Sequence, residues 1–223
     1  MTMLMKQLKL HINFHYKAIL IFWILALLIK GALNAAHLNG LKISYLPEII
    51  NNPSIAIMMF IIVSTFNIQD DLFRLAISFG VTRIQYFIGA ICYIVLQSAL
   101  FSFLQVMFLN DMKYNIVNVS FWEQSAQQFI IQFLFYVTTA CFFQVAVVFK
   151  QRFQWMGLMI GGTLFLSTNS VLYGEVGING LLFTSDISLI DIPYFTVISI
   201  GLTILYILTS SIFIRKVSFE QTV

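Results

Sequence analysis

The stretch QDDLFRLAISFGVTRIQYFIG, residues 69–89, separates two apolar runs and determines how the chain is organised. It carries four charged residues in a chain of 223, of which 60% are hydrophobic and 9% are charged. Soluble domains carry about 25% charged residues, so this chain is too apolar to cover a surface exposed to water. The composition therefore predicts an integral membrane protein with a single domain over residues 1–223.

Charge-free intervals mark the membrane spans, because a spanning helix needs about 20 mostly apolar residues. The first span is interrupted by Lys30, whose long side chain is expected to reach the far interface. The sequence predicts an all-α membrane protein with six transmembrane helices. They lie near residues 18–38, 52–69, 84–108, 122–149, 153–173 and 192–214.

Basic residues concentrate at one end of these spans, which orients them by the positive-inside rule. If both termini lie on one side, that side holds nine of the twelve Lys and Arg residues. The nine are Lys6, Lys9, Lys17, Arg74, Arg83, Lys150, Arg152, Arg215 and Lys216. Both termini are therefore predicted to be cytoplasmic. The segment 174–191 is predicted to be extracellular, and its glycine-broken, apolar sequence is compatible with a re-entrant path where protein covers its backbone.

The segment before the first span, residues 1–16, is predicted to be an amphipathic helix on the cytoplasmic leaflet. Apolar side chains share one helical stripe, and lysines lie elsewhere on the helix. The residues of this interfacial helix are Leu4, Lys6, Leu8, Lys9 and Ile12. His11 and His15 have a spacing compatible with metal binding, but no Glu or Cys completes a site. Interfacial placement is therefore expected for both histidines, and no metal is expected.

No catalytic set is found in the sequence. The motifs HExxH, GxSxG and GxxxxGK[ST] are absent, so no hydrolytic or phosphate-binding chemistry is expected from this chain. Cys92 and Cys141 lie inside apolar runs and are interpreted as buried, apolar side chains. Apart from Glu123 at the start of the fourth span, five of the six spans contain no charged residue, which argues against an ion-coupled transporter. If the chain transports a substrate, the energy must come from another subunit.

Residues 70–81 are predicted to form a short cytoplasmic helix between the second and third spans. Asp70 and Asp71 place negative charge at its N-terminus, and Gly80 occupies the C′ position that ends it. The pair Thr82 and Gln85 forms a capping box that opens the third span. The apolar face of the helix consists of Leu72, Leu75, Ala76 and Phe79. Spacing alone fits this face equally well to lipid headgroups and to a groove on a partner protein.

The run FRLAISFGVTR (73–83), followed by YFIG (86–89), resembles the cytoplasmic loop of ABC-2-type exporter permeases. Gly80, Arg83 and Gly89 match that pattern best. Asp70 and Asp71 stand where many members have a Glu-rich start, so the acidic character is kept and the identity is not. The resemblance covers this loop in sequence and the full length of the chain in architecture.

In that family the loop is the coupling helix, which fits a cleft on the nucleotide-binding subunit. The resemblance implies an ATPase-coupling interface with both apolar and charged residues. Its residues are Asp70, Asp71, Leu72, Phe73, Arg74, Leu75, Ala76, Phe79, Gly80 and Arg83.

The resemblance also implies the partners and the location of the protein. It implies a non-enzymatic, multi-pass permease in a bacterial cell membrane. This permease would pair with a second permease, identical or homologous, and with two ABC ATPase subunits. The ATPase subunits would bind ATP and Mg²⁺. The permease itself would have no cofactor and no nucleic-acid partner. The small size and the composition, rich in Ile, Phe and Asn, resemble exporters of amphipathic peptides such as phenol-soluble modulins.

Two other functions remain open at the level of the sequence. A non-transporting membrane scaffold or immunity protein would use the same short helix to bind a different partner. A secondary transporter would need a coupling ion, which the charge-free spans do not favour. An ATPase that co-purifies with the chain and is stimulated by it would distinguish the exporter from both.

Overall fold

The computed structural model describes residues 3–38, 53–110, 121–153, 156, 159, 161–163 and 192–214. Helices account for nearly all of these residues, and no strand occurs among them. The helices are α1 (Met3–Leu38), α3 (Ser54–Asn67), α4 (Phe73–Ser78), α5 (Arg83–Asn110), α6 (Phe121–Phe153) and α9 (Ile192–Ile214), with a π-helical segment η1 (Ile68–Leu72) between α3 and α4. The predicted all-α class is therefore confirmed for the described residues.

Four helices are long and apolar enough to cross a membrane, namely α1, α5, α6 and α9. The apolar helix α3 is shorter, with 14 residues. The predicted sixth span, 192–214, has the bounds of α9. Most of the predicted fifth span, 153–173, and all of the segment 174–191 lie outside the described residues.

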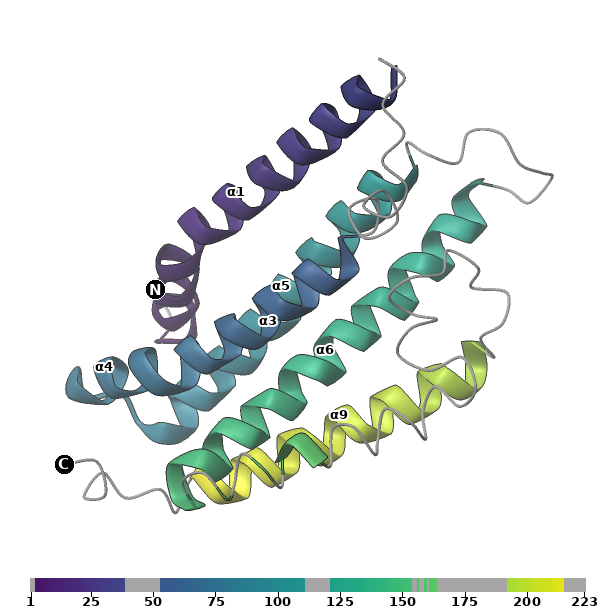
Figure 1. Cartoon of the computed structure of the whole chain (residues 1–223). Coiled ribbons are helices and arrows are strands. Elements are labelled where there is room, and N and C mark those ends of the chain that lie inside the picture. The colour runs from purple at the N-terminus through teal and green to yellow at the C-terminus, as the bar shows by residue number, and fades with distance from the viewer. Residues whose placement is uncertain are drawn as a thin grey trace.

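The helices form a bundle with α5 and α6 at its centre (Figure 1). Helix α1 packs on α5, α9 packs on α6, and α3 packs against both α5 and α6. The start of α1, the link between α4 and α5, and the C-terminal ends of α6 and α9 lie at one end of the bundle (Figure 1). We call this the elbow end.

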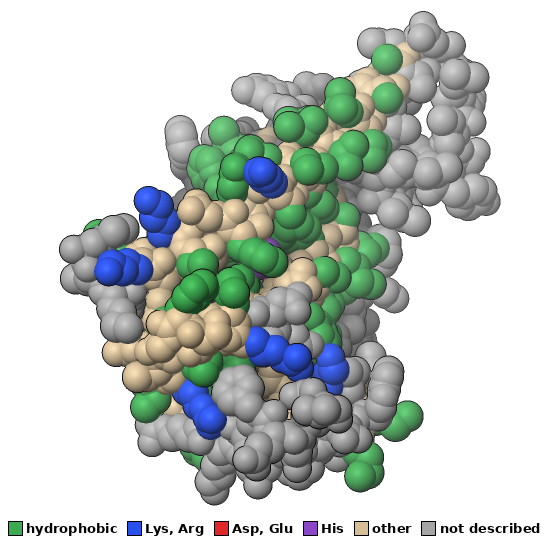
Figure 2. Space-filling model, turned by 90° about the vertical axis from the view of Figure 1, so that its left-hand side faces the viewer, with side chains coloured by type: hydrophobic (Ala, Val, Ile, Leu, Met, Phe, Trp, Pro, Cys, Tyr) green, Lys and Arg blue, Asp and Glu red, His purple; other side chains and the backbone are tan. Residues whose placement is uncertain are grey.

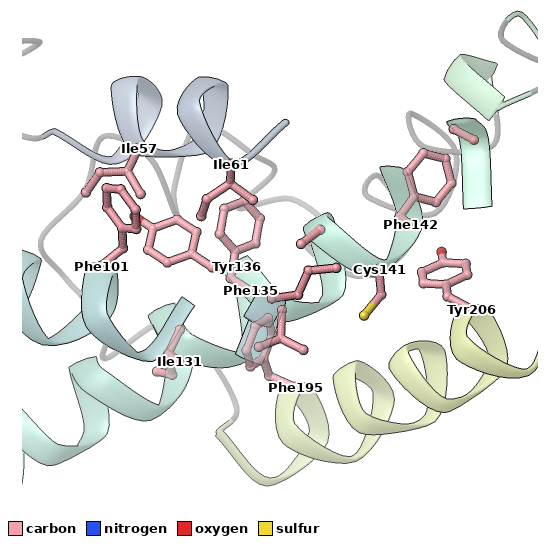
Figure 3. Close-up of a cluster of buried hydrophobic side chains, with 14 of the residues drawn as sticks. Ile57, Ile61, Phe101, Ile131, Phe135, Tyr136, Cys141, Phe142, Phe195 and Tyr206 are labelled. Atoms are coloured by element: carbon pink, nitrogen blue, oxygen red, sulfur yellow. The ribbon is translucent and has the colours of Figure 1, made fainter. Parts of the chain in front are cut away.

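Aromatic side chains dominate the interior of the bundle. The ring of Phe101 is fully buried and lies 5.2 Å from that of Phe60 and 5.7 Å from that of Trp23, measured between centroids. Figure 3 shows Ile57 and Ile61 of α3 directed toward Phe101 and Tyr136. Such interlocking rings hold helices together by packing, which is the main attraction available between helices in lipid.

Uncharged polar side chains share this interior. Ser64 Oγ donates a hydrogen bond to Gln97 Oε1 over 3.1 Å, which joins α3 to α5. Gln105 of α5 donates to Ser54 of α3 and accepts from the hydroxyl of Tyr136 in α6. Because water is absent from a bilayer core, such bonds between helices fix their register. The absence of charge in the spans therefore does not make their interior apolar.

The N-terminal segment differs from the prediction, because α1 is a single helix of 36 residues. No glycine or proline separates residues 1–16 from residues 18–38, so nothing in the sequence interrupts the backbone hydrogen bonds there. Ile12 is exposed and Leu8 is half-buried, while the side chain of Leu4 lies outside the described residues. The helix therefore continues into the first span without a break, and the interfacial position of residues 1–16 stays a prediction.

Lys30 lies on the inward face of α1. Its side chain is 8% exposed, whereas the preceding Leu28 is 63% exposed and Ile29 is 47% exposed. The outward face of α1 at this level is thus apolar, and Lys30 points toward the rest of the chain. The expected reach of its ammonium group to the far membrane interface stays a prediction.

A close approach between α1 and α5 explains the glycine at position 89. A Cβ atom at Gly89 would lie 2.5 Å from Oε1 and 3.1 Å from Cβ of Gln7. We expect Gly89→Val to force the two helices apart, at a cost of about 1–3 kcal/mol. A chain of this size then unfolds at a temperature lower by roughly 3 °C or more in a thermal scan. Gly201→Val is the matched control, since nothing lies within 4 Å of a Cβ there; equal losses at both positions would contradict the close approach.

Candidate functional site: the Gly80 elbow

The segment between α3 and α5 is a continuation of α3. Helix α3 passes through η1 into α4 without leaving helical backbone geometry, and both Ile68 and Leu72 are right-handed helical. Asp70 and Asp71 therefore lie inside the π-helical segment η1 and not at a helix N-terminus. The predicted stabilisation by negative charge at the start of a separate helix is wrong, because no breaker follows Asn67 and a π turn accommodates the extra residue. We call residues 68–82 the elbow.

The elbow ends in a Schellman motif. Gly80 has φ +78°, which is accessible to glycine without strain. The Gly80 N–H donates to the carbonyl of Ile77 over 2.9 Å, and the Val81 N–H donates to that of Ala76 over 3.1 Å. This is the 5→2 and 6→1 pair that defines the motif. The predicted C′ role of Gly80 is confirmed.

Helix α5 then starts with the predicted capping box. The Thr82 N–H donates to Gln85 Oε1 over 3.2 Å, and the Gln85 N–H donates to Thr82 Oγ1 over 3.4 Å. These bonds satisfy two backbone donors that the first turn leaves without helical partners. The Schellman motif that ends α4 at its C′ residue Gly80 is therefore followed within three residues by the start of α5 at Arg83.

Substitution at Gly80 tests this geometry. We expect Gly80→Ala to destabilise the chain by about 1–2 kcal/mol, because a side chain is strained at positive φ. This corresponds to a drop of roughly 2–8 °C in the midpoint of thermal unfolding. Gly31→Ala is the matched control, since Gly31 lies inside α1 with open space around it. It should be neutral or stabilising, and the same sign of change at both positions would contradict the assignment.

Helix α4 presents two different faces. Leu72, Phe73 and Ala76 are each 1% exposed. They belong to a buried group that we call the elbow cluster. Its members are Ile68, Leu72, Phe73, Ala76, Tyr86, Phe87, Ala90, Tyr93 and Ile214. By contrast, Phe79 is 73% exposed and Leu75 is 42% exposed.

The amphipathic face predicted for this helix is therefore not one surface. Leu72 and Ala76 anchor the elbow to α5 and α9 through the elbow cluster, whereas Leu75 and Phe79 are available for contact. Helical spacing predicted one apolar face for these four residues, but tertiary packing buries two of them and leaves the other two exposed. Arg74 is exposed and Arg83 is half-buried, and the side chains of Asp70 and Asp71 lie outside the described residues.

Basic side chains surround the apolar ones at the elbow end. Figure 2 looks onto this end and shows Lys and Arg side chains spread around exposed hydrophobic side chains. Six of the nine residues predicted to share one side have described side chains. Lys6, Lys9, Lys17 and Arg74 are exposed, and Arg83 and Lys150 are half-buried. The face is thus apolar in part and positively charged at its edges.

The two histidines of α1 lie inside the bundle at this end. His11 is fully buried and His15 is 3% exposed. The His11 ring lies 5.3 Å from the ring of Tyr86 and 5.4 Å from that of Tyr93, between centroids. Tyrosines of α5 provide a packing surface for both imidazoles, and the interfacial placement expected for the two histidines stays a prediction. Within the described part of the chain no group of three or more His, Cys, Asp or Glu side chains is arranged to hold a metal ion.

Two residues that sequence analysis did not select hold the elbow from outside. Tyr86 of α5 donates its hydroxyl hydrogen to the carbonyl of Ile68. Gln151 Nε2 of α6 donates to the carbonyl of Gln69 over 2.9 Å. The sequence pattern gave no signal for either bond. Each acceptor is a backbone carbonyl, and its donor lies 18 or 82 positions further along the chain.

The described part of the chain is all-helical, with four helices long and apolar enough to cross a membrane and a partly apolar turn, the elbow, at one end. The chain belongs to the family described as "Protein of unknown function (DUF4052)", which it matches over residues 4–220. A search of curated proteins gave no match, and a search of solved structures gave none either. Membership of this family assigns no activity, so function is argued from the elbow itself.

Proposed function

We propose that this protein is the membrane-spanning permease subunit of an ABC exporter and that the elbow is its coupling helix. The observation that carries the proposal is the exposed ring of Phe79 on a turn held rigidly by the Schellman motif and the elbow cluster. A large apolar ring exposed beside basic residues is suited to an apolar cleft on a protein with acidic groups nearby.

The rigidity of the elbow supports a mechanical role. Phe73 packs edge-on against Tyr86 with 5.2 Å between centroids, which ties α4 to the first turn of α5. The Schellman motif and the capping box leave little freedom between them. A displacement applied at Phe79 would therefore pass to α3 and α5 without being absorbed by a flexible loop.

In this proposal the permease has six spans and cytoplasmic termini. The fifth span falls on residues 153–173, and the distribution of Lys and Arg supports a cytoplasmic elbow end. The membrane in this proposal is that of a bacterial cell. Two ATPase subunits bind ATP and Mg²⁺ and supply the energy, because the sequence of this chain has no phosphate-binding GxxxxGK[ST] motif. A second permease, identical or homologous, completes the transporter.

Transport follows from the movement of the elbow. ATP binding closes the ATPase dimer, the elbow moves with it, and the spans change between inward-open and outward-open arrangements. The cargo that fits the resemblance is an amphipathic peptide. Its path runs between the two permeases.

Affinity purification from the native host tests the proposal. The tagged chain is extracted in mild detergent, and proteins that co-purify are identified and assayed for ATP hydrolysis, with an untagged strain as the control. The expected result is a near-stoichiometric ATPase with nucleotide-binding motifs, whose hydrolysis is stimulated by the permease. Stoichiometric recovery of a partner without such motifs would replace the exporter by a membrane scaffold or immunity protein.

A further inference from the structure

The π-helical segment η1 is held by two neighbouring helices at adjacent carbonyls. In a π turn the hydrogen bonds skip one more residue than in an α-helix, and such turns recur at functional sites. The carbonyl of Ile68 accepts from Tyr86 of α5, and the next carbonyl, that of Gln69, accepts from Gln151 of α6. The irregular turn is thus bonded to both central helices.

Buried backbone surrounds both bonds. Ile68 and Leu72 are each 1% exposed and Gln69 is fully buried. The bond from Tyr86 is buried and the bond from Gln151 is part-buried, so water competes least at the carbonyl of Ile68. Hydrogen bonds gain strength in such a low-dielectric environment, and an unpaired carbonyl there is costly.

The end of α6 meets the end of α3 through further contacts. Lys150 Nζ lies 5.8 Å from the centre of the Phe66 ring, and the Phe66 ring lies 6.2 Å from that of Phe143. Gln151 adds a directional bond to this packing. The end of α6 is therefore attached to η1, the turn at which the elbow begins.

From these contacts we propose that Tyr86 and Gln151 are positioning residues that latch the π turn, and that Gln151 passes elbow movement to α6. The second part rests on the proposed function, and the first does not. With the latch formed, α4 and the end of α6 move as one body. With it open, α4 pivots at η1 while α6 stays in place.

Hydrogen exchange on the full-length chain in detergent tests the latch. Tyr86→Phe removes the donor and keeps the ring contacts with Phe73 and His11, and Gln151→Leu removes the amide. We expect each variant to speed amide exchange in peptides covering residues 66–78 by roughly fivefold, the effect of losing one hydrogen bond. Exchange in α9 should not change. Unaltered exchange at residues 66–78 in both variants would overturn the latch.

Two matched controls and one rescue sharpen this test. Tyr194→Phe and Gln127→Leu make the same chemical changes at exposed positions of α9 and α6, and both should exchange like the wild type. Gln151→Lys retains an N–H donor and should restore slow exchange. Faster exchange in the controls, or a failed rescue, would show that the bonds themselves are not responsible.

The transmission role is measured with the partner ATPase present. We expect Gln151→Leu to bind the ATPase in the wild-type ratio while its stimulation of ATP hydrolysis falls severalfold. Stimulation equal to that of the wild type would overturn transmission through Gln151. If exchange responds as expected and no ATPase binds even the wild-type chain, the latch stands and the proposed function fails.

Discussion

Phe79→Asp is expected to weaken binding of the ATPase by roughly 30-fold or more, the effect of losing a central aromatic anchor. The ring is 73% exposed and lies outside the elbow cluster, so its replacement leaves the packing of that cluster in place. A carboxylate in its place would have to enter an apolar cleft without a partner, which adds to the loss. Export should fall with binding.

The measurement is the amount of ATPase that co-purifies with the variant at equal permease concentration. Phe79→Leu is the matched control, because it keeps an apolar side chain at the same position and should retain most of the binding. Thermal unfolding of both variants should match the wild type. Wild-type binding by Phe79→Asp would contradict a docking role for the elbow.

Phe73→Ala is expected to lower the stability of the chain rather than to remove a group that contacts the ATPase. Phe73 is 1% exposed and packs within the elbow cluster. Truncating a buried phenylalanine costs about 3–5 kcal/mol, and for a chain of this size we expect the thermal midpoint to fall by roughly 10 °C. Thermal unfolding in detergent, followed by tryptophan fluorescence, measures the change.

Phe103→Ala provides the comparison for Phe73→Ala. Phe103 is 54% exposed on α5, so the same truncation there creates no cavity and should shift the midpoint by only a degree or two. Similar losses at both positions would mean that the elbow cluster does not stabilise the chain. Phe73→Ala and Phe79→Asp together distinguish two phenylalanines that the resemblance placed in one contact set. Phe73 is buried and supports the elbow, whereas Phe79 is exposed on it.

Local signals of the elbow could be read from sequence because they depend on neighbouring residues. Gly80 is followed by Val81, and Thr82 stands three residues before Gln85, and in each case the hydrogen bonds join residues within one or two turns. Nothing beyond the segment is needed to form them, so the sequence pattern was sufficient.

Features that depend on distant partners could not be read in this way. Whether Leu72 or Leu75 is buried is decided by α5 and α9, which lie later in the chain. The continuous helix through η1 is likewise held by Tyr86 and Gln151. A short segment contains no information on these neighbours, and so the single apolar face and the separate helix were wrong.

The inward face of α1 shows a second limit of sequence patterns. An apolar stripe marks the buried side of a helix in water, but here Gln7, His11 and His15 are buried and Ile12 is exposed. In a bilayer the apolar side chains face lipid without cost, and polar side chains turn toward other helices. The same logic explains why Gln97 and Gln105 lie inside the bundle although the predicted span 84–108 carries no charged residue.

Photocrosslinking at position 79 in living cells shows whether the elbow docks on a nucleotide-hydrolysing partner. A benzophenone amino acid replaces Phe79, and a second strain carries it at Phe103, which is exposed on the side of α5. We expect position 79 to crosslink to a protein with ATP-binding motifs, and position 103 to crosslink to lipid. Lipid adducts alone at position 79 would contradict this expectation and identify the elbow as a membrane-surface turn.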